Sequence, residues 1–308
     1  MGRYVVRRIL QAIPVLIGVT FIIFCLVFAL HGDPIQALAG EKRADPTIAA
    51  ILRARYHLDQ PLIVQYWYYI SGLFTGDLGT TYTGRAISDI VDQRFPVTLQ
   101  LSLTAFGIEA VIGVLAGTLA ALRRGRFVDN LVLISTLFLI SVPVFVLGSV
   151  LQLVLGVQWQ IFPVAGIEDG WPTSYILPGL VLASTSMAYI SRLTRTSVME
   201  AVRADYVRTA IAKGLPRRRV IGVHTLRNSL IPVVTFLGMD LGALMGGAII
   251  TERVFNLPGL GGQLAQSVYL RERPVVVGLT TLLVLIYLVA NLVVDVLYAV
   301  LDPRIRYE

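Results

Sequence analysis

Long apolar runs alternate with polar segments along the whole of this 308-residue chain. Each run is close to the roughly 20 residues that an α-helix needs to cross the hydrocarbon core of a bilayer. Because only helices and closed barrels satisfy their backbone in lipid, the pattern predicts an all-α, polytopic membrane protein with about six transmembrane helices. The predicted spans are 9–30, 97–122, 131–157, 175–191, 229–250 and 275–300.

The first apolar run follows Arg3, Arg7 and Arg8, and basic residues before an apolar core also describe a secretory signal peptide. The run is long for the core of a signal peptide, and no small-x-small cleavage site follows it. We therefore expect a retained membrane helix, kinked at Pro14.

The segment 31–95 contains no run long enough to cross a membrane. An aromatic cluster at 66–69 is typical of a membrane–water interface, and Gly76, Gly79 and Gly84 interrupt any continuous helix. We expect an extracytoplasmic cap with one interfacial helix. A surface that receives an external partner or substrate is an equal alternative, and the two are compatible.

A polar, basic stretch at 192–232 separates the fourth and fifth spans. Apolar residues recur in it every four positions, which predicts a narrow apolar stripe along one face of a helix. The stripe consists of Val198, Val202, Tyr206 and Ala210.

A sharp turn is expected to end that helix. Lys213 falls in its last turn and Gly214 just past it, which are the positions of a C-terminal cation and a left-handed cap. Pro216 then stands where a second helix begins. The stretch is therefore predicted to be a compact helix–turn–helix protrusion outside the membrane, and we interpret it as the docking surface for a partner.

The charge pattern orients the chain. Hydrophobic residues make up 56% of it and charged residues 15%, against about 25% charged in soluble domains. The net charge of +7 comes from arginines spread over short loops, which argues against nucleic-acid binding. The loop 158–174 has no Lys or Arg, whereas 192–228 is rich in them, so the positive-inside rule places both termini and the protrusion in the cytoplasm.

Motifs for catalysis are missing from the sequence. There is no phosphate-binding loop, and the only lysines are Lys42 and Lys213. The three histidines are scattered, and Cys25 is the single cysteine, so neither a metal cluster nor a disulfide framework is expected.

Three acidic residues fall inside apolar runs, where charges are costly and often functional. Glu109 lies in the second span, Asp240 in the fifth and Asp295 in the sixth. Asp295, near the cytoplasmic end, is interpreted as structural. Glu109 and Asp240 line a transport pathway in one interpretation and satisfy helix–helix hydrogen bonds in the other. Gly238 and Gly242 have the spacing of close helix packing, either within the chain or against a second subunit.

The loop 255–262, FNLPGLGG, follows the fifth span on the extracytoplasmic side. Its turn-forming residues suit a lid that folds back over a pathway, and they suit a plain connector equally well. The candidate gate residues are Phe255, Pro258, Gly259 and Gly261.

The stretch DYVRTAIAKGL at 205–215, followed by RRRVIGVHTLRNSLIPVV at 217–234, resembles the signature cytoplasmic loop of ABC-importer permeases. It is most similar to the B-type permease of dipeptide, oligopeptide and nickel importers. Arg208 stands where the general motif begins with Glu, a departure that peptide-type permeases tolerate. Further matches are RYVVRRILQAIPVLIGVTFIIF at 3–24, GDP at 32–34, LDQPLIVQY at 58–66, GDLG at 76–79, RFPVTLQL at 94–101, PGLGG at 258–262 and NLVVDVLYAVLDPRIRY at 291–307.

The resemblance implies a non-catalytic subunit of the bacterial inner membrane that imports peptides. It implies a second homologous permease, two ATPases that carry the ATP and Mg²⁺, an extracytoplasmic solute-binding protein and surrounding lipids, with no cofactor on this chain and no nucleic acid. It also implies that the cytoplasmic loop couples to an ATPase. The expected coupling residues are Asp205, Tyr206, Arg208, Ala210, Lys213, Gly214 and Leu215.

We expect one permease domain over 1–308, in which 1–30 is the N-terminal tail and first span and 31–95 the extracytoplasmic segment. The five-span core, 96–308, includes the coupling loop 192–228. Nickel chelates, glutathione and haem are alternative solutes. A stand-alone secondary transporter would want inverted repeats and clustered charges in the membrane, and a receptor or scaffold would have no use for the kinked spans.

Overall fold

The computed structural model describes residues 2–28 and 46–301, and this part of the chain consists of helices without a β-strand. The GDP motif at 32–34, the beginning of the extracytoplasmic segment and the DPRIRY motif at 302–307 lie outside the described residues. The all-α expectation is confirmed.

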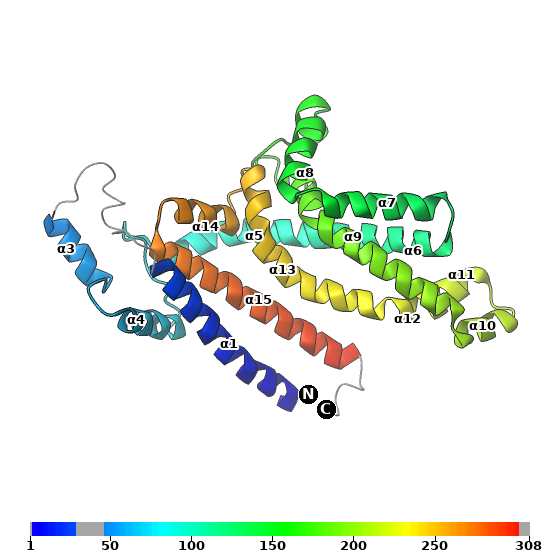
Figure 1. Cartoon of the computed structure of the whole chain (residues 1–308), viewed down its shortest axis with the longest axis horizontal. Helices are drawn as coiled ribbons and strands as arrows, with labels where there is room; N and C mark the ends of the chain where they lie inside the picture. The colour runs from blue at the N-terminus through cyan, green and yellow to red at the C-terminus, as the bar shows by residue number, and fades with distance from the viewer. Residues whose placement is uncertain (1, 29–45, 302–308) are drawn as a thin grey trace.

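Three groups of helices occupy different parts of the molecule (Figure 1). The long helices form a bundle, α3, α4 and α14 lie toward one end, and α10 and α11 protrude at the other. The bundle comprises α1 (Gly2–Phe28), α5 (Ile87–Ile108), η1 (Glu109–Gly113), α6 (Val114–Leu122), α7 (Phe127–Ser141), α8 (Val144–Leu151), η2 (Gln152–Gln158), α9 (Thr173–Arg203), α13 (Ile231–Val254) and α15 (Arg273–Leu301). The remaining elements are α3 (Pro46–Arg55), α4 (Leu62–Phe74), α10 (Asp205–Ala212), α11 (Arg217–Arg219), η3 (Val220–Leu226), α12 (Arg227–Ser229) and α14 (Leu260–Tyr269).

Four helices in the described part are long and apolar enough to cross a membrane, and two bent pairs bring the number to six if each pair crosses as one span. One pair is α7 with α8 and η2, bent by 107°, and the other joins 217–229 to 231–246 with a bend of 49°. The sharper of the two bends falls at Pro143, inside the third predicted span, 131–157. Val142 and Pro143 are both extended, because the proline ring excludes a helical residue before it.

The second span begins ten residues earlier than predicted. Its helix starts at Ile87 and continues to Leu122 through the π-helical segment η1. The charges in its first two turns hid the start from a hydropathy pattern, although Asp89 is favourable there because it faces the positive end of the helix dipole.

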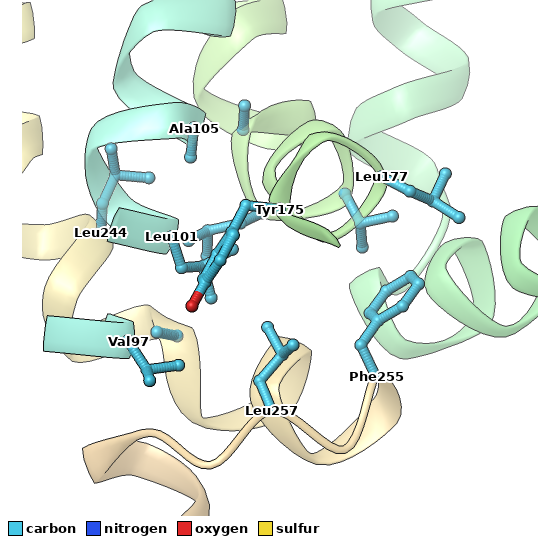
Figure 2. Packing of buried hydrophobic residues seen from close by; sticks show 12 residues of the cluster. Val97, Leu101, Ala105, Tyr175, Leu177, Leu244, Phe255 and Leu257 are labelled. Carbon is cyan, nitrogen blue, oxygen red and sulfur yellow. The ribbon is translucent and has the colours of Figure 1, made fainter. Parts of the chain in front are cut away.

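Helix α9 is the centre of the bundle and packs against α5, α6, α7 and α13. Glycines on the second span allow this approach. A Cβ at Gly113 would lie 2.7 Å from Cγ2 of Ile190, and one at Gly117 would lie 2.7 Å from Cβ of Thr194. The largest apolar cluster joins α5, α9, α13 and the segment that follows α13 (Figure 2). Its labelled members are Val97, Leu101, Ala105, Tyr175, Leu177, Leu244, Phe255 and Leu257.

Helix α4 lies against α1 and α15, and its aromatic cluster divides between two surroundings. The Tyr66 hydroxyl is 3.0 Å from the Thr20 hydroxyl, and Tyr69 donates to Thr281 at 2.6 Å. Trp67 is 69% exposed, as an interfacial side chain would be. Half of the predicted interfacial cluster therefore serves helix packing.

Candidate functional site

The chain changes direction where α9 meets the protrusion. Ala204 is extended, with ψ of 148°, and separates α9 from α10. The predicted stripe on one continuous helix is therefore wrong: Val198 on α9 is fully buried, whereas Val202 and Tyr206 are 40% and 43% exposed. No Gly or Pro marks this break in the sequence. The four-residue spacing therefore predicted one helix where the structure has two.

The turn that ends α10 is a Schellman cap, as the sequence predicted. Gly214 has φ of +73°, its N–H donates to Ile211 O at 2.9 Å, and Leu215 N–H donates to Ala210 O at 3.3 Å. Pro216 follows as the N-terminal boundary of α11. Glycine suits this position, because a residue with an L side chain would be strained at that φ.

A small apolar core holds the protrusion together. Val207, Ala210 and Val220 are at most 6% exposed, and Leu215 packs against them. This core folds η3 back onto α10. Ala210 and Leu215, two of the expected coupling residues, therefore stabilise the protrusion from inside.

The outer surface of α10 carries the other expected residues. Asp205, Tyr206, Arg208, Lys213 and Gly214 are all exposed. The ion pair between Arg208 and Asp205, at 3.7 Å, is solvated on both sides and contributes little to stability. Ile211, which the sequence analysis missed, is 60% exposed on the same short helix. The protrusion thus combines charged groups with two exposed apolar side chains, the composition of a protein-docking surface.

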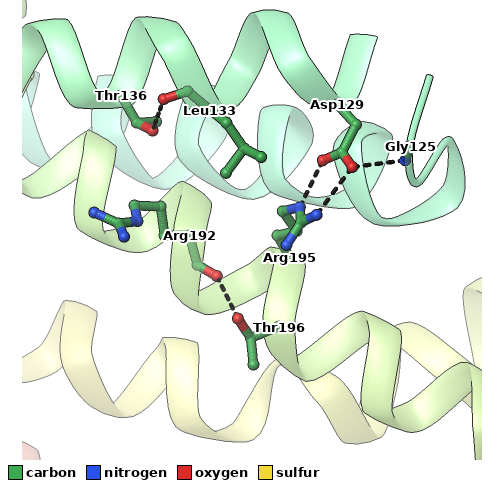
Figure 3. A network of polar contacts seen from close by, with 7 residues as sticks. All are labelled: Gly125, Asp129, Leu133, Thr136, Arg192, Arg195 and Thr196. Carbon is green, nitrogen blue, oxygen red and sulfur yellow. Dashed lines mark hydrogen bonds and ion pairs between the residues drawn. The ribbon is translucent and has the colours of Figure 1, made fainter. Parts of the chain in front are cut away.

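A largely buried ion pair joins α9 to the beginning of α7, eight residues before α9 ends (Figure 3). Arg195 on α9 donates from Nε to Asp129 Oδ1 at 2.6 Å and from Nη2 to Oδ2 at 2.9 Å. The N–H of Gly125 donates to Oδ2 as well, at 2.8 Å. Asp129 is only 2% exposed. Sequence periodicity cannot find this pair, because its members lie on different helices.

The second candidate group lies at mid-bundle. Glu109, at the start of η1, is fully buried, and Asp240 on α13 is half-buried. Gly238 and Gly242 pack within the chain against α15, since Cβ atoms there would lie 2.8 Å from Val294 and 3.0 Å from Tyr287.

The candidate gate loop is pinned by a glutamate that the sequence analysis did not single out. Glu252, fully buried, accepts from the Thr98 hydroxyl at 2.6 Å and from Gly262 N–H at 2.7 Å. The hydroxyl oxygen of Thr98 also accepts the N–H of Leu260 at 2.8 Å. Gly259 lies directly against the Glu252 carboxyl, where a Cβ would collide with it. The sequence signal was present: Glu252 is a charge between an apolar span and a glycine-rich turn.

The four gate residues differ in environment. Phe255 is 1% exposed and belongs to the largest apolar cluster, and Pro258 is half-buried. Gly261 is buried, and a Cβ there would lie 2.6 Å from Ile249 Cα. The loop is thus closed onto the bundle in this structure.

No group of three or more His, Cys, Asp or Glu side chains that could hold a metal ion occurs within residues 2–28 and 46–301.

Comparison with known proteins gives consistent matches over the whole length. The family described as "Binding-protein-dependent transport system inner membrane component" matches residues 113–307, and the N-terminal family of the same membrane components matches residues 1–102. The chain is 41% identical to the glutathione transport system permease protein GsiC of Escherichia coli strain K12, over 100% of both chains. The same identity and coverage hold for GsiC of Escherichia coli O6:H1 and of Salmonella typhimurium.

Proposed function

The chain belongs to the family of binding-protein-dependent transport system inner membrane components, and we propose that α10 couples this permease to an ATPase. The resemblance to an ABC-importer permease of the peptide and nickel class is confirmed by the matched families and relatives. The protein is therefore a multi-pass membrane permease. The finer statements below are proposals.

The observation that carries the coupling proposal is the combination of rigidity and exposure in α10. A short helix transmits movement only if both of its ends are fixed. The Schellman cap at Gly214 fixes one end, and the core around Val207 fixes the body. Tyr206 and Ile211 remain available to enter a groove of the partner. Lys213, Arg208 and Asp205 surround them as a polar rim, and buried anchors inside such a rim dominate many interfaces.

We propose a complex of this permease with a second, homologous permease, two ATPases that bind ATP and Mg²⁺, and an extracytoplasmic solute-binding protein. The chain itself would be non-catalytic and would form half of the translocation pathway. The basic residues of 192–228 favour a cytoplasmic protrusion and cytoplasmic termini. The proposal includes a single permease domain over 1–308, with an extracytoplasmic segment at 31–95.

The proposed solute is a short peptide. Glutathione, named for the relatives, belongs to this chemical class because it is a tripeptide with a free ammonium group.

Affinity purification in mild detergent tests the assembly. The expected partners are a second multi-span protein and two P-loop ATPases, and the purified complex in proteoliposomes should take up glutathione or a dipeptide only with ATP and the binding protein. Replacing Gly214 by Pro should abolish uptake in an assembled complex, because proline cannot adopt the required φ. A chain that purifies alone and transports without ATPases would contradict the proposal.

A further inference from the structure

Two glutamates in the described part of the chain are fully buried, and their surroundings differ completely. Glu252 accepts hydrogen bonds from Thr98 and Gly262. Glu109 is likewise 0% exposed, yet neither of its carboxyl oxygens has a hydrogen-bond donor. An orphaned buried carboxyl is costly, so a native protein that keeps one supplies something that satisfies it.

The group nearest in chemistry is the carboxyl of Asp240. Leu101 and Ala105 of α5 share one apolar cluster with Leu244, and Ala110 of η1 packs against the cluster that contains Leu237. The two helices therefore run antiparallel in a register that places residue 240 opposite residue 109. On α13, Asp240 is therefore the carboxyl that this register brings nearest to Glu109. Oδ2 of Asp240 is also buried and lacks a donor.

Ionised carboxyl oxygens can only accept hydrogen bonds, so two facing carboxylates cannot bond to each other. Two negative charges in contact also repel strongly where water is excluded. One proton removes both difficulties, because the protonated carboxyl donates to its partner. We propose that Glu109 and Asp240 form a proton-binding site in the membrane-spanning bundle, in which the two carboxyls share a proton.

The cations of α5, α9 and α13 in the described part of the chain lie away from Glu109 and Asp240 or are engaged elsewhere. Next to Glu109, α9 presents Met187 and Ile190 to Gly113, while Arg195 is engaged by Asp129 and Arg192 is exposed. The remaining charges of α13 are Glu252 and Arg253, which lie at least 12 residues, or about 18 Å of helix, from Asp240. Those of α5 are Asp89, Asp92 and Arg94, which lie at its opposite end.

The site joins two elements that matter for movement. Glu109 begins the π-helical segment η1, and such irregular turns recur at functional positions. Asp240 belongs to α13, which continues through α12 and η3 into the protrusion. Loss of the proton would place two like charges in contact and drive α13 away from η1. The shared proton therefore holds these helices in the arrangement seen here.

Infrared difference spectroscopy on the complete complex in lipid nanodiscs tests the site directly through the stretching band of a protonated carboxyl. We expect such a band near neutral pH, shifted by deuterium exchange and lost on alkaline titration. Glu109→Gln should remove it. Asp240→Asn should change the pH at which the band is lost, because an amide then replaces one of the two carboxyls. Glu252→Gln is the matched control and should leave the band in place.

A complex with no protonated-carboxyl band sensitive to Glu109→Gln would overturn the proposal. A Glu109 band whose pH dependence is the same in the Asp240→Asn complex would overturn it too, because the proton would then belong to one residue alone. If one variant fails to assemble, the other still decides, because the proposal requires the band to respond to both substitutions. These readouts require no transport, so they are independent of the proposed solute and of the coupling role of α10.

Discussion

Arg195 and Asp129 meet through two parallel hydrogen bonds, from Nε at 2.6 Å and from Nη2 at 2.9 Å. The pair joins α9 to the beginning of α7, and the N–H of Gly125 completes the coordination of the carboxylate. Both helices belong to the bundle, and α9 continues for eight residues beyond Arg195 before the break at Ala204. The planar fork of Arg195 therefore holds α7 against the part of α9 that leads to the protrusion.

Removal of Arg195 should destabilise the bundle. Arg195→Ala leaves the buried Asp129 with one backbone donor, and loss of one partner of a buried pair costs about 3–5 kcal/mol. The free energy of unfolding in detergent, followed by denaturant titration, should fall by that order. Arg208→Ala is the control and should leave stability unchanged, because its ion pair is exposed. Equal effects of the two substitutions would refute the bracing role.

The cap of α10 offers a test of backbone strain. Gly214→Ala places a side chain at φ of +73°, which costs about 1–2 kcal/mol within the protrusion. We expect weaker coupling of ATP hydrolysis to uptake with the membrane helices intact. Gly222→Ala is the matched control, because that helical glycine has open space around its Cβ position and no positive φ. The measured quantity is the ratio of ATP hydrolysed to solute transported. Only Gly214→Ala should raise this ratio.

The pinned loop is sensitive to a single methyl group. Gly259→Ala pushes the Glu252 carboxyl away from its donors on Thr98 and Gly262. Each buried polar group left unsatisfied costs about 1–3 kcal/mol, so thermal stability should drop measurably. Gly246→Ala, where nothing lies within 4 Å of the added Cβ, is the control. A normal melting temperature for the Gly259 variant would show that Glu252 relaxes without loss.

Ile211 should contribute to ATPase binding although it contributes nothing to the internal core. Ile211→Asp puts a charge at a position that is 60% exposed in the free protrusion. If the side chain is an anchor, affinity for the ATPase should fall about tenfold or more, or about 1.4 kcal/mol. Val268→Asp, at a position 57% exposed on α14 at the other end, should leave that affinity unchanged. Surface plasmon resonance with nanodisc-embedded permease measures both.

Hydropathy alone predicts most of the bundle, because apolar length is what a membrane selects. The cap at Gly214 was also predictable, since a glycine between Lys213 and a proline-led segment has few other uses. The break at Ala204 was not, because alanine favours helix and only the packing of Val207 against Val220 explains the bend.

Contacts between residues on distant helices could not be predicted from the sequence either, because they too depend on packing. Asp129 and Arg195 carry no local signature, and the register that brings Glu109 to Asp240 is set by apolar neighbours. Glu252 could have been noticed as a charge beside the PGLGG turn, but its donor Thr98 lies on another helix.

Site-specific photocrosslinking from α10 tests the central claim most directly. A photoreactive amino acid at Tyr206, which is 43% exposed, should crosslink to a P-loop ATPase in the membranes of cells that express the whole complex. The same amino acid at Tyr269, 85% exposed at the end of α14, should not crosslink to that ATPase. An adduct with the ATPase from position 206 alone agrees with the account. If position 206 gives no ATPase adduct in an assembled, transporting complex, α10 is not the coupling element.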